Sequence, residues 1–584
     1  MTGRLSALPK RLLQFASILA LTFPAVAYAA PPAHAKIKET KEVGRDVSKP
    51  LKELAASAEA KRLKQPVGPD GIIDIRPERD GPVGPKPGAG VDRARQSSET
   101  SPLTATIAAP LANFDGLSNQ DNFNLFGGRV NPPDPVGAVG PNHYVEMVNL
   151  AFAVYDKAGN ALVPATSLAA LWAGFSVTDC EDISGDPIVL YDQFMDRWIL
   201  SQFTTAGTNG EFFNCVAISQ TSDPTGAYYR YAFSTGINFP DYPKYGNWTD
   251  SYVITTREFG PNFGYGIGVY ALEKNKMVNG QPARAVGFYL EAQSDDGSFF
   301  DPDLLPLIGD GLLPAYVDGK QKPQSGDAIP IIGTQDDGAS YGATFDALNI
   351  FDLTVKWHST PDASLVLAAQ LPVASFDSIF PCAPTSRDCL PQPGVANPAQ
   401  YLDILSYRQR PTWRLAYRNF KNYDAMVTTQ SVEAAPGVAG MRWYEIRRVN
   451  GSYSVYQQGT YAPADGVHRW MGSVAMDRQG NIGLGYSVVD GVSVKPGIRY
   501  TGRLAGDALG QMTLGEGTIV DGTGVQLTTN SRWGDYTSLN LDPADDCTMW
   551  YVNEYYTAAG QASSLAGWNT RIASFKLPGC VAPQ

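Results

Sequence analysis

The chain has 584 residues, of which 43% are hydrophobic and 18% charged, a composition that belongs to a folded protein with a large core rather than to a disordered one. Its 58 glycines, 43 prolines, 29 tyrosines, 24 phenylalanines and 10 tryptophans favour short strands joined by turns over long helices. Residues 106–584 contain 29 Lys and Arg against 47 Asp and Glu. This acidic excess argues against nucleic acid or an anionic membrane as a partner, because both bind basic surfaces.

Residues 1–30 have the pattern of a secretory signal peptide. Three basic residues precede an apolar stretch from Leu12 to Val26, and small residues follow before an expected cleavage ahead of Ala30. The stretch is shorter than the roughly 20 residues that span a bilayer, which argues against the alternative of a membrane anchor. We therefore predict a secreted or periplasmic protein without membrane insertion, and a monomer.

The mature chain contains six cysteines, and an even number in an exported protein indicates disulfides. Sequence alone leaves the pairing open, but proximity favours Cys180–Cys215, Cys382–Cys389 and Cys547–Cys580. Zinc ligation would need CxxC spacing or nearby histidines, and neither occurs. We predict no metal site and no cofactor.

Residues 31–109 are predicted to form a disordered leader. A charged, alanine-rich stretch gives way to a stretch rich in proline and glycine, and one marginal helix is expected around Leu51 to Leu63. The alternative is that this region is a pro-segment. Removal of residues 36–95 is expected to leave thermal stability nearly unchanged.

From Asn113 onward, pairs of strands recur with turns between them and no long helical pattern. Positions that mark the pairs are 54 to 85 residues apart, which is typical of a β-propeller built from antiparallel blades. The fold prediction is all-β, a single large propeller of about seven blades over residues 110–582; a pair of β-sandwiches is the alternative. These pairs are interpreted as the second and third strands of each unit: HYVEMVN with FAVYDK, RWILSQF with NCVAISQ, SYVITTREF with GVYALEK, AIPIIGTQ with LNIFDLTV, WRLAYRNF with RWYEIRR, NIGLGYSVV with IRYTGRL, and TMWYVNEYY with RIASFKL.

The fourth unit shows no clear first strand, and the segments 294–325 and 377–400 are interpreted as long loops that carry binding. A propeller must also join its last blade to its first, and the chain ends too soon to supply a fourth strand for the seventh unit. We predict that Leu103–Leu111 supplies it, with Asn122–Phe126 as the second choice.

The turn AMDRQGNIGLGY (475–486) and its echo YDKAGN (155–160) resemble the Asp-containing hairpins of sialidase-like, BNR-type propellers, in which an Asp side chain caps the turn. The motif S/T-x-D-x-G-x-x-W of that family is not reproduced. The segments PPDPVGAVGPNHYVEMVN and RWGDYTSLNLDPADDCTMWYVNEYY are also similar to large exported bacterial proteins of unassigned activity. The resemblance implies a fold and a compartment and carries no catalytic residues.

In a propeller, the residues just before each first strand gather around the central axis. The candidates are charged or aromatic, and such a cluster could hold a sugar through cations, with Asp as acid or base. The alternative is structural, because Asp-Pro before a strand is a common turn and arginines next to tryptophan suit stacking. The axial candidates are Asp134, Asp186, Lys244, Tyr245, His468, Arg469, Arg532 and Asp535.

The sequence contains no P-loop, HExxH or GxSxG motif that would name a reaction. The predicted function is interaction with extracellular carbohydrate or another small ligand through an axial pocket, and the sequence does not decide whether turnover occurs. The enzyme hypothesis is a glycoside hydrolase or lyase. The alternative is a non-catalytic propeller for adhesion or ligand capture. Two facing carboxyl groups would favour cleavage, and carboxylates all tied to arginines would favour binding or structure.

Overall fold

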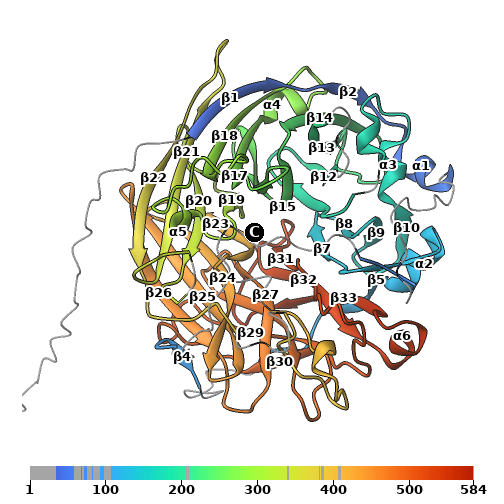
Figure 1. Ribbon diagram of the computed structural model, residues 1–584, viewed down its shortest axis with the longest axis vertical. Helices are drawn as coiled ribbons and strands as arrows, with labels where there is room; N and C mark the ends of the chain where they lie inside the picture. Colours follow the sequence, from blue (N-terminus) through green and yellow to red (C-terminus); the bar gives the residue numbers. More distant parts are fainter. Residues whose placement is uncertain are drawn as a thin grey trace, which may run out of the picture.

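The structure is a computed structural model that describes residues 35–57, 68, 71–74, 82, 92–97 and 107–582, except 183, 205, 206, 208, 209, 339, 340, 381, 383–386 and 405–408. The expected signal peptide lies outside the described residues, as do parts of the leader. Most of the described chain is strand, and the fold is the predicted seven-bladed β-propeller (Figure 1).

The first three blades are antiparallel meanders of four strands each. Blade 1 consists of β7 (Val136–Val139), β8 (His143–Val148), β9 (Ala151–Asp156) and β10 (Ala161–Ser167). Blade 2 consists of β11 (Ile188–Asp192), β12 (Arg197–Phe203), β13 (Phe212–Ser219) and β14 (Tyr228–Gly236). Blade 3 consists of β15 (Phe239–Asn247), β16 (Ser251–Phe259), β17 (Tyr265–Glu273) and β18 (Arg284–Gln293).

The last four blades repeat the four-strand pattern. Blade 4 consists of β19 (Leu313–Val317), β20 (Ile329–Gln335), β21 (Ala347–Lys356) and β22 (Asp362–Pro372). Blade 5 consists of β23 (Thr412–Asn419), β24 (Asp424–Ala435), β25 (Val438–Val449) and β26 (Ser452–Tyr461). Blade 6 consists of β27 (His468–Met476), β28 (Ile482–Val489), β29 (Gly497–Arg503) and β30 (Glu516–Val520), and blade 7 of β31 (Ser538–Leu541), β32 (Thr548–Tyr556), β33 (Trp568–Lys576) and β5 (Ala112–Ser118).

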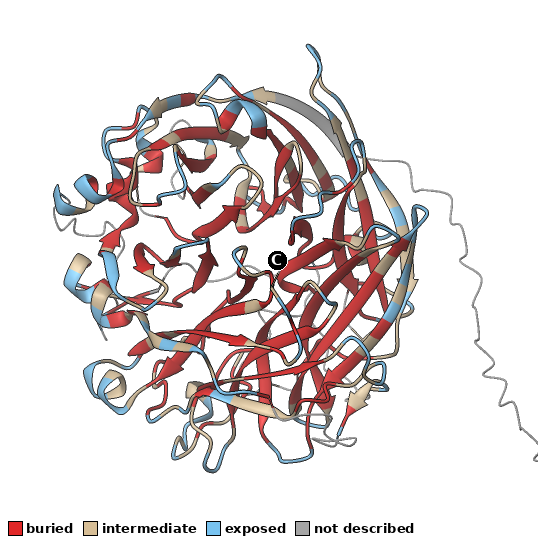
Figure 2. Cartoon of the chain, turned by 180° about the vertical axis from the view of Figure 1, so that it is seen from behind, coloured by how far each residue is buried: buried red, intermediate tan, exposed pale blue. Residues whose placement is uncertain are grey.

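The first strand of each blade is innermost, and the seven inner strands contact one another in a closed ring, β7, β11, β15, β19, β23, β27, β31 and back to β7. Blades 4 and 5 are joined further by parallel pairing of β19 with β23. Each blade packs between two others, so strands such as β16 and β27 are buried at every position (Figure 2). Two buried faces favour continuous apolar runs over strict alternation, as the sequence shows.

Short helices occupy connections between strands: α1 (Leu51–Ser57), α2 (Asn119–Phe126), α3 (Leu168–Trp172), α4 (Lys274–Met277), α5 (Leu305–Ile308) and α6 (Ala558–Ser563). In the part of the chain that the structure describes, no helix has the length and apolar character needed to cross a bilayer. A small parallel pair, β3 (Ile72–Asp74) with β6 (Arg129–Asn131), lies outside the blades.

Two strand assignments in the repeat were wrong. In the fifth unit, WRLAYRNF is the inner strand β23 rather than the second strand, and the true second strand is β24. In the fourth unit the missing first strand is β19, which lies inside the segment 294–325 that was interpreted as a loop. A five-residue strand that contains a proline gives too weak a periodic signal to stand out from its loop.

The ring is closed by the N-terminal side of the chain, as predicted, but by a different segment. β5 pairs antiparallel with β33, from Ala112 opposite Ser574 to Ser118 opposite Asn569, and forms the outer strand of blade 7. The first choice, 103–111, ends where β5 begins, and residues 103–106 lie outside the described residues. The second choice is wrong, because residues 122–126 belong to α2, whose N-cap Ser118 makes a capping box with Asp121.

The described parts of the leader are ordered, which corrects the expectation for those segments. β1 (Ala35–Lys41) and β2 (Gly44–Val47) add outer strands to blades 3 and 2, and β4 (Arg95–Gln96) pairs with β26 (Figure 1). The expected marginal helix is present as α1, with Leu51 and Leu54 buried. The sequences of β1 and β2 show little apolar periodicity. They form strands because their backbones hydrogen-bond to the otherwise unpaired edges of β18 and β14.

All three predicted disulfides are confirmed: Cys180–Cys215, Cys382–Cys389 and Cys547–Cys580. They are consistent with an oxidising, extracytoplasmic compartment. The Asp-capped turns are present as well. Asp477 Oδ1 accepts the backbone N–H groups of Gln479 (2.8 Å) and Asn481 (3.1 Å), and Asp156 does the same for Ala158 and Asn160.

Glu146 ties the closing strand to blade 1 from inside the protein. It lies on β8, is fully buried, and accepts the Leu117 N–H at 2.8 Å and the Thr570 hydroxyl at 2.5 Å. Burial raises the pKa of Glu146 to about 7, although both hydrogen bonds favour the ionised form. The neutral acid is therefore the form that the fold favours.

We expect truncations to separate the roles of the N-terminal segments. Deleting residues 36–57 should lower the melting temperature by a few degrees, because it uncovers β14 and β18 and removes the Arg230–Asp46 ion pair (2.6 Å). Extending the deletion through Ser118 should abolish cooperative unfolding. Differential scanning calorimetry of both truncations measures this, and a cooperative transition in the longer deletion would show that β5 is not needed for closure.

We expect Glu146 to make stability pH-dependent. Its pKa is higher in the folded than in the unfolded chain, so its contribution is fully present below pH 4.5 and is lost as the pH rises to about 7. The loss is about 3 kcal/mol at 1.36 kcal/mol per pKa unit. Urea denaturation of the wild type should show this fall, Glu146→Gln should flatten it, and Glu211→Gln on the surface should not. Parallel pH profiles for all three proteins would disprove the role of Glu146.

Candidate functional site

Each inner strand has a residue in the left-handed region shortly before its start or, in β15 and β27, at its fourth residue. Blade 4 uses the glycines Gly309 and Gly311, and the other six blades use Asp134 (φ 49°), Asp186 (44°), Tyr242 (51°), Gln409 (40°), Met471 (49°) and Asp535 (63°). A non-glycine residue in this region costs of order 1 kcal/mol and is uncommon outside functional or tightly constrained positions. The repetition places one such residue from each blade at the same end of the central channel.

Contacts between blades show that these starting residues converge. The Asp134 N–H donates to the Gly534 carbonyl (2.9 Å), which joins blades 1 and 7. The Tyr536 hydroxyl donates to Asp186 (2.9 Å), which joins blades 7 and 2. We call the group at this end the axial cluster: Asp134, Asp186, Tyr242, Lys244, Arg410, Arg532, Asp535 and Tyr536.

Asp134 has the most unusual environment in the cluster. It is 1% exposed, and neither of its carboxylate oxygens has a hydrogen-bond partner among the described residues. Burial first, and then the negative charges of Asp186 and Asp535, raise its pKa well above the usual range of an aspartate. Lys244 and Arg532 oppose this shift. Asp134 therefore favours the neutral, proton-bearing form. The neighbouring carboxylates have partners, because Asp186 accepts the Tyr536 hydroxyl and Asp535 pairs with Arg532.

Lys244 lies between two aromatic rings. Its ammonium group is 3.0 Å from the centre of the Tyr242 ring and 3.5 Å from that of Tyr536, and it donates to the Pro243 carbonyl at 3.3 Å. Burial lowers the pKa of Lys244 well below its ordinary value, in opposition to the attraction of Asp186. Arg410 stacks on the same Tyr242, with its guanidinium carbon 4.0 Å from the ring centre.

The remaining charges of the cluster are partly neutralised by each other. Arg532 pairs with Asp535, and Arg410 approaches Asp310 at 3.8 Å. Asp310 also pairs with Arg257 at 2.7 Å, so a second charged group adjoins the cluster on the side of blades 3 and 4. Facing carboxyl groups favour cleavage, whereas carboxylates all tied to arginines favour binding or structure. The cluster matches neither case, because some of its carboxylates are tied to arginines and Asp134 is not.

Five of the eight residues predicted from sequence are brought together: Asp134, Asp186, Lys244, Arg532 and Asp535. The other three have different partners. Tyr245, the neighbour of Lys244 on β15, is buried in the core between blades, where Ser201 is its hydrogen-bond partner. Successive strand residues point to opposite faces, so Lys244 and Tyr245 could not both face the axis.

His468 and Arg469 serve blade packing. The His468 Nδ1 accepts the Ala439 N–H (3.3 Å), its ring meets Phe380 edge-on, and burial lowers its pKa to about 4. Arg469 is fully buried and pairs with Asp465 and Glu516, each at 2.7 Å. Both precede the left-handed Met471 by two or three residues, so the prediction chose positions too early in this blade.

The sequence analysis missed Tyr242, Arg410 and Tyr536. A usable signal was present, because Tyr242 and Arg410 are each followed by proline, as are Asp134 and Asp186. Aligning the units on this X-Pro pair marks the left-handed residue of three inner strands and, in blade 5, the residue that follows it. Tyr536 has no such marker, and only its contacts with Asp186 and Lys244 reveal it.

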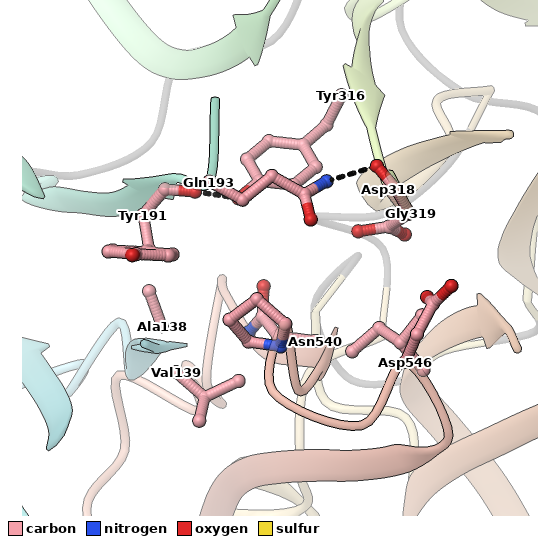
Figure 3. A pocket seen from close by; sticks show the side chains of 11 residues that line it. Ala138, Val139, Tyr191, Gln193, Tyr316, Asp318, Gly319, Asn540 and Asp546 are labelled. Carbon is pink, nitrogen blue, oxygen red and sulfur yellow. Dashed lines mark hydrogen bonds between the residues drawn. The ribbon is translucent and has the colours of Figure 1, made fainter. Parts of the chain in front are cut away.

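The opposite end of the channel has a pocket of a different kind (Figure 3). It is lined by the last residues of inner strands from blades 1, 2, 4 and 7, and its two carboxylates are tied to arginines: Asp318 to Arg414 and Asp546 to Arg418, each at 2.6 Å. The Gln193 side chain donates to the Gly319 carbonyl at 2.8 Å. These groups hold blades together, and both carboxylates that line the pocket are neutralised by an arginine.

Three carboxylates outside the channel lie close to one another. Ligand oxygens of Asp336, Asp337 and Asp346 are within 4.8 Å of each other, a spacing that a divalent cation could bridge. Protein donors already occupy the two buried members. Asp336 accepts from Ser378, and Asp346 accepts from the backbone of Asp337 and Phe376. The cluster thus has a structural explanation as a loop anchor.

Comparison with protein-family models gives no match, and comparison with curated protein sequences gives none either. Among solved structures, the chain is similar to an endo-arabinase from Bacteroides thetaiotaomicron, with 11% identity over 55% of this chain and 94% of that one and a TM-score of 0.23. It is also similar to Trypanosoma rangeli sialidase, with 8% identity over 67% and 54% and a TM-score of 0.27. A phage phi92 endosialidase matches with 8% identity over 76% and 68% and a TM-score of 0.30.

The match spans little more than half of the sialidase chain. At these identities and TM-scores, the likeness carries no argument about activity. The propeller assignment rests on the strand order and on the ring of inner strands.

We expect Arg469 to be structural. Replacing it with Gln removes the ion pairs of Arg469 with Asp465 and Glu516 and leaves Glu516, whose side chain is 10% exposed, only the longer contact with Arg499 at 3.6 Å. The free energy of unfolding should therefore fall by about 3 kcal/mol. Arg478→Gln is the control, because Arg478 is half-buried and its side chain donates to the Val581 carbonyl. Guanidinium denaturation measures both; equal midpoints would contradict a structural role for Arg469.

Proposed function

We propose that this protein is a secreted glycoside-cleaving propeller whose reaction takes place at the axial cluster, with Asp134 as the general acid. The observation that carries the proposal is the environment of Asp134: buried, without a hydrogen-bond partner for either oxygen among the described residues, and beside two further carboxyl groups. A carboxylic acid kept protonated near neutral pH is what protonation of a glycosidic oxygen requires.

Asp186 is the partner of Asp134 in this proposal. It accepts the Tyr536 hydroxyl at 2.9 Å, and that hydrogen bond favours the ionised carboxylate. Two carboxyl groups whose surroundings favour opposite protonation states are the usual requirement for acid–base cleavage of a glycoside. Asp186 then acts on the other side of the bond, as base or nucleophile, and Lys244 offsets the negative charge of the pair.

A second candidate function is binding without turnover. The pairing of Arg532 with Asp535 and of Arg257 with Asp310 favours it, because such pairs fix geometry and do not exchange protons. In that case the axial cluster holds a ligand through hydrogen bonds from hydroxyl groups. Asp134 is the residue that separates the two functions, since only cleavage needs its proton.

The test is a panel of extracellular polysaccharides and oligosaccharides, scored for retention and for release of reducing ends. We expect Asp134→Asn to lower kcat by about 10²- to 10⁴-fold with little change in retention, because the amide cannot supply a proton. The control is Asp196→Asn, since Asp196 is also left-handed (φ 53°) but lies on the exposed turn after β11. Activity of the wild type should fall as the pH rises through the raised pKa of Asp134.

The outcomes separate the alternatives. Retention that Asp134→Asn weakens, with no product released by the wild type, would support binding without turnover. Full activity in Asp134→Asn would show that the axial cluster is not where cleavage occurs.

A further inference from the structure

Three phenylalanine side chains are exposed at one tip of blade 3. Phe263, in the turn between β16 and β17, is 65% exposed, and Phe299 and Phe300, just after β18, are 36% and 45% exposed. A β-carbon on Gly297 would lie 4.0 Å from the Phe263 ring, so the two loops are adjacent. We call these three residues the phenylalanine rim. Clustered exposed aromatic side chains mark an interaction site more often than scattered ones do.

The rim is held in place by its backbone. Asp295 Oδ1 accepts the N–H groups of Asn262 (2.7 Å), Phe263 (3.2 Å) and Gly264 (3.2 Å), which fastens one loop to the other. The Phe299 N–H donates to the Ser294 hydroxyl at 3.0 Å. Exposed rings on a fixed backbone lose little conformational freedom when a ligand stacks on them.

The rim lies at the same end of blade 3 as the axial cluster. Strand β16 carries Arg257, which pairs with Asp310, and ends at Phe259, one residue before the turn that carries Phe263. In the pairing of β15 with β16, Phe239 at the start of the inner strand lies opposite Phe259. At 3.3 Å per residue, Phe263 is within about 20 Å of Arg257 along the chain. Arg257 and Arg410 share Asp310, and Arg410 stacks on Tyr242 of the axial cluster.

The charge around the rim restricts its ligand. Residues 285–303, which carry two of the three rings, contain five acidic residues, none of them buried, and no Lys or Arg. Such a surface repels anionic lipids, nucleic acids and polyanionic glycans. Sugar rings without acidic groups fit it, because their C–H faces stack on aromatic rings and their hydroxyls donate to carboxylates such as Asp296.

We propose that the phenylalanine rim is a stacking subsite for an uncharged or cationic polysaccharide chain whose neighbouring units reach the axial cluster. This inference rests on the proposed function, and it assigns the substrate class as a polymer rather than a short or acidic sugar. The rim would hold the chain several sugar units away from Asp134.

The test uses the mature chain carrying Asp134→Asn, so that bound polymer is not consumed. Retention is measured on xylan, β-1,3-glucan, chitin and chitosan, with alginate and polygalacturonate as polyanions, and on vesicles of phosphatidylcholine with phosphatidylglycerol. We expect Phe263→Ala, Phe299→Ala and Phe300→Ala together to weaken retention on a neutral or cationic polymer at least tenfold. Phe123→Ala, which removes a ring of 46% exposure on α2, is the matched control and should change nothing.

Unchanged melting temperature is expected for the triple variant, because the removed rings are exposed. Three results would each overturn the inference. The triple variant could be retained as well as the starting protein, the starting protein could fail to bind every neutral or cationic polymer, or the triple variant could lose binding to vesicles alone. If retention depends on the rim but the wild-type protein releases no product, the subsite stands and the proposed cleavage fails.

Discussion

The fold depends on hydrogen bonds that pair the backbone of one open sheet edge, the outer edge of β33. The chain runs through seven blades and reaches β33 with the backbone N–H and C=O groups of that edge unpaired, and β5 from the N-terminal side supplies the partner. The same pairing brings Leu117 and Thr570 to Glu146, which joins blade 7 to blade 1 inside the protein. Once the ring is closed, the starts of all seven inner strands have fixed positions around the axis, and every cluster described above follows from that geometry.

Closure also explains why so many polar groups are buried. Blades pack face to face, so polar residues of inner strands have protein, and not water, as neighbours, and most are paired with arginine, tyrosine or backbone. Arg469 with Asp465 and Glu516, and Arg414 with Asp318, are of this kind. Asp134 differs because its oxygens have no hydrogen-bond partner among the described residues, and an unsatisfied buried carboxyl group is costly. That cost is the physical reason for assigning it a chemical role.

The two ends of the channel also differ in whether their carboxyl groups are neutralised by arginines. At the end where the inner strands begin, left-handed residues bring three carboxyl groups, Lys244 and two tyrosines together. At the end where the strands finish, Asp318 and Asp546, both labelled in Figure 3, are neutralised by bidentate pairing with Arg414 and Arg418. A group that must exchange a proton cannot also be locked in an ion pair, which is why the proposed acid–base chemistry is placed at the first end. The phenylalanine rim lies at that end as well.

The sequence by itself determined the strand-rich class, the number of blades, the three disulfides and five members of the axial cluster, because these follow from local periodicity, from proximity along the chain and from the position of residues before a strand. It could not identify β5, β1 and β2 as blade strands, since such segments become strands only where an open edge offers them partners. It also could not show that Lys244 and Arg532 belong to the axial cluster while Tyr245 and Arg469 do not. Which face a side chain occupies, and which charge it meets, depends on bulges and on blades that are distant in sequence, and only the tertiary structure brings those together.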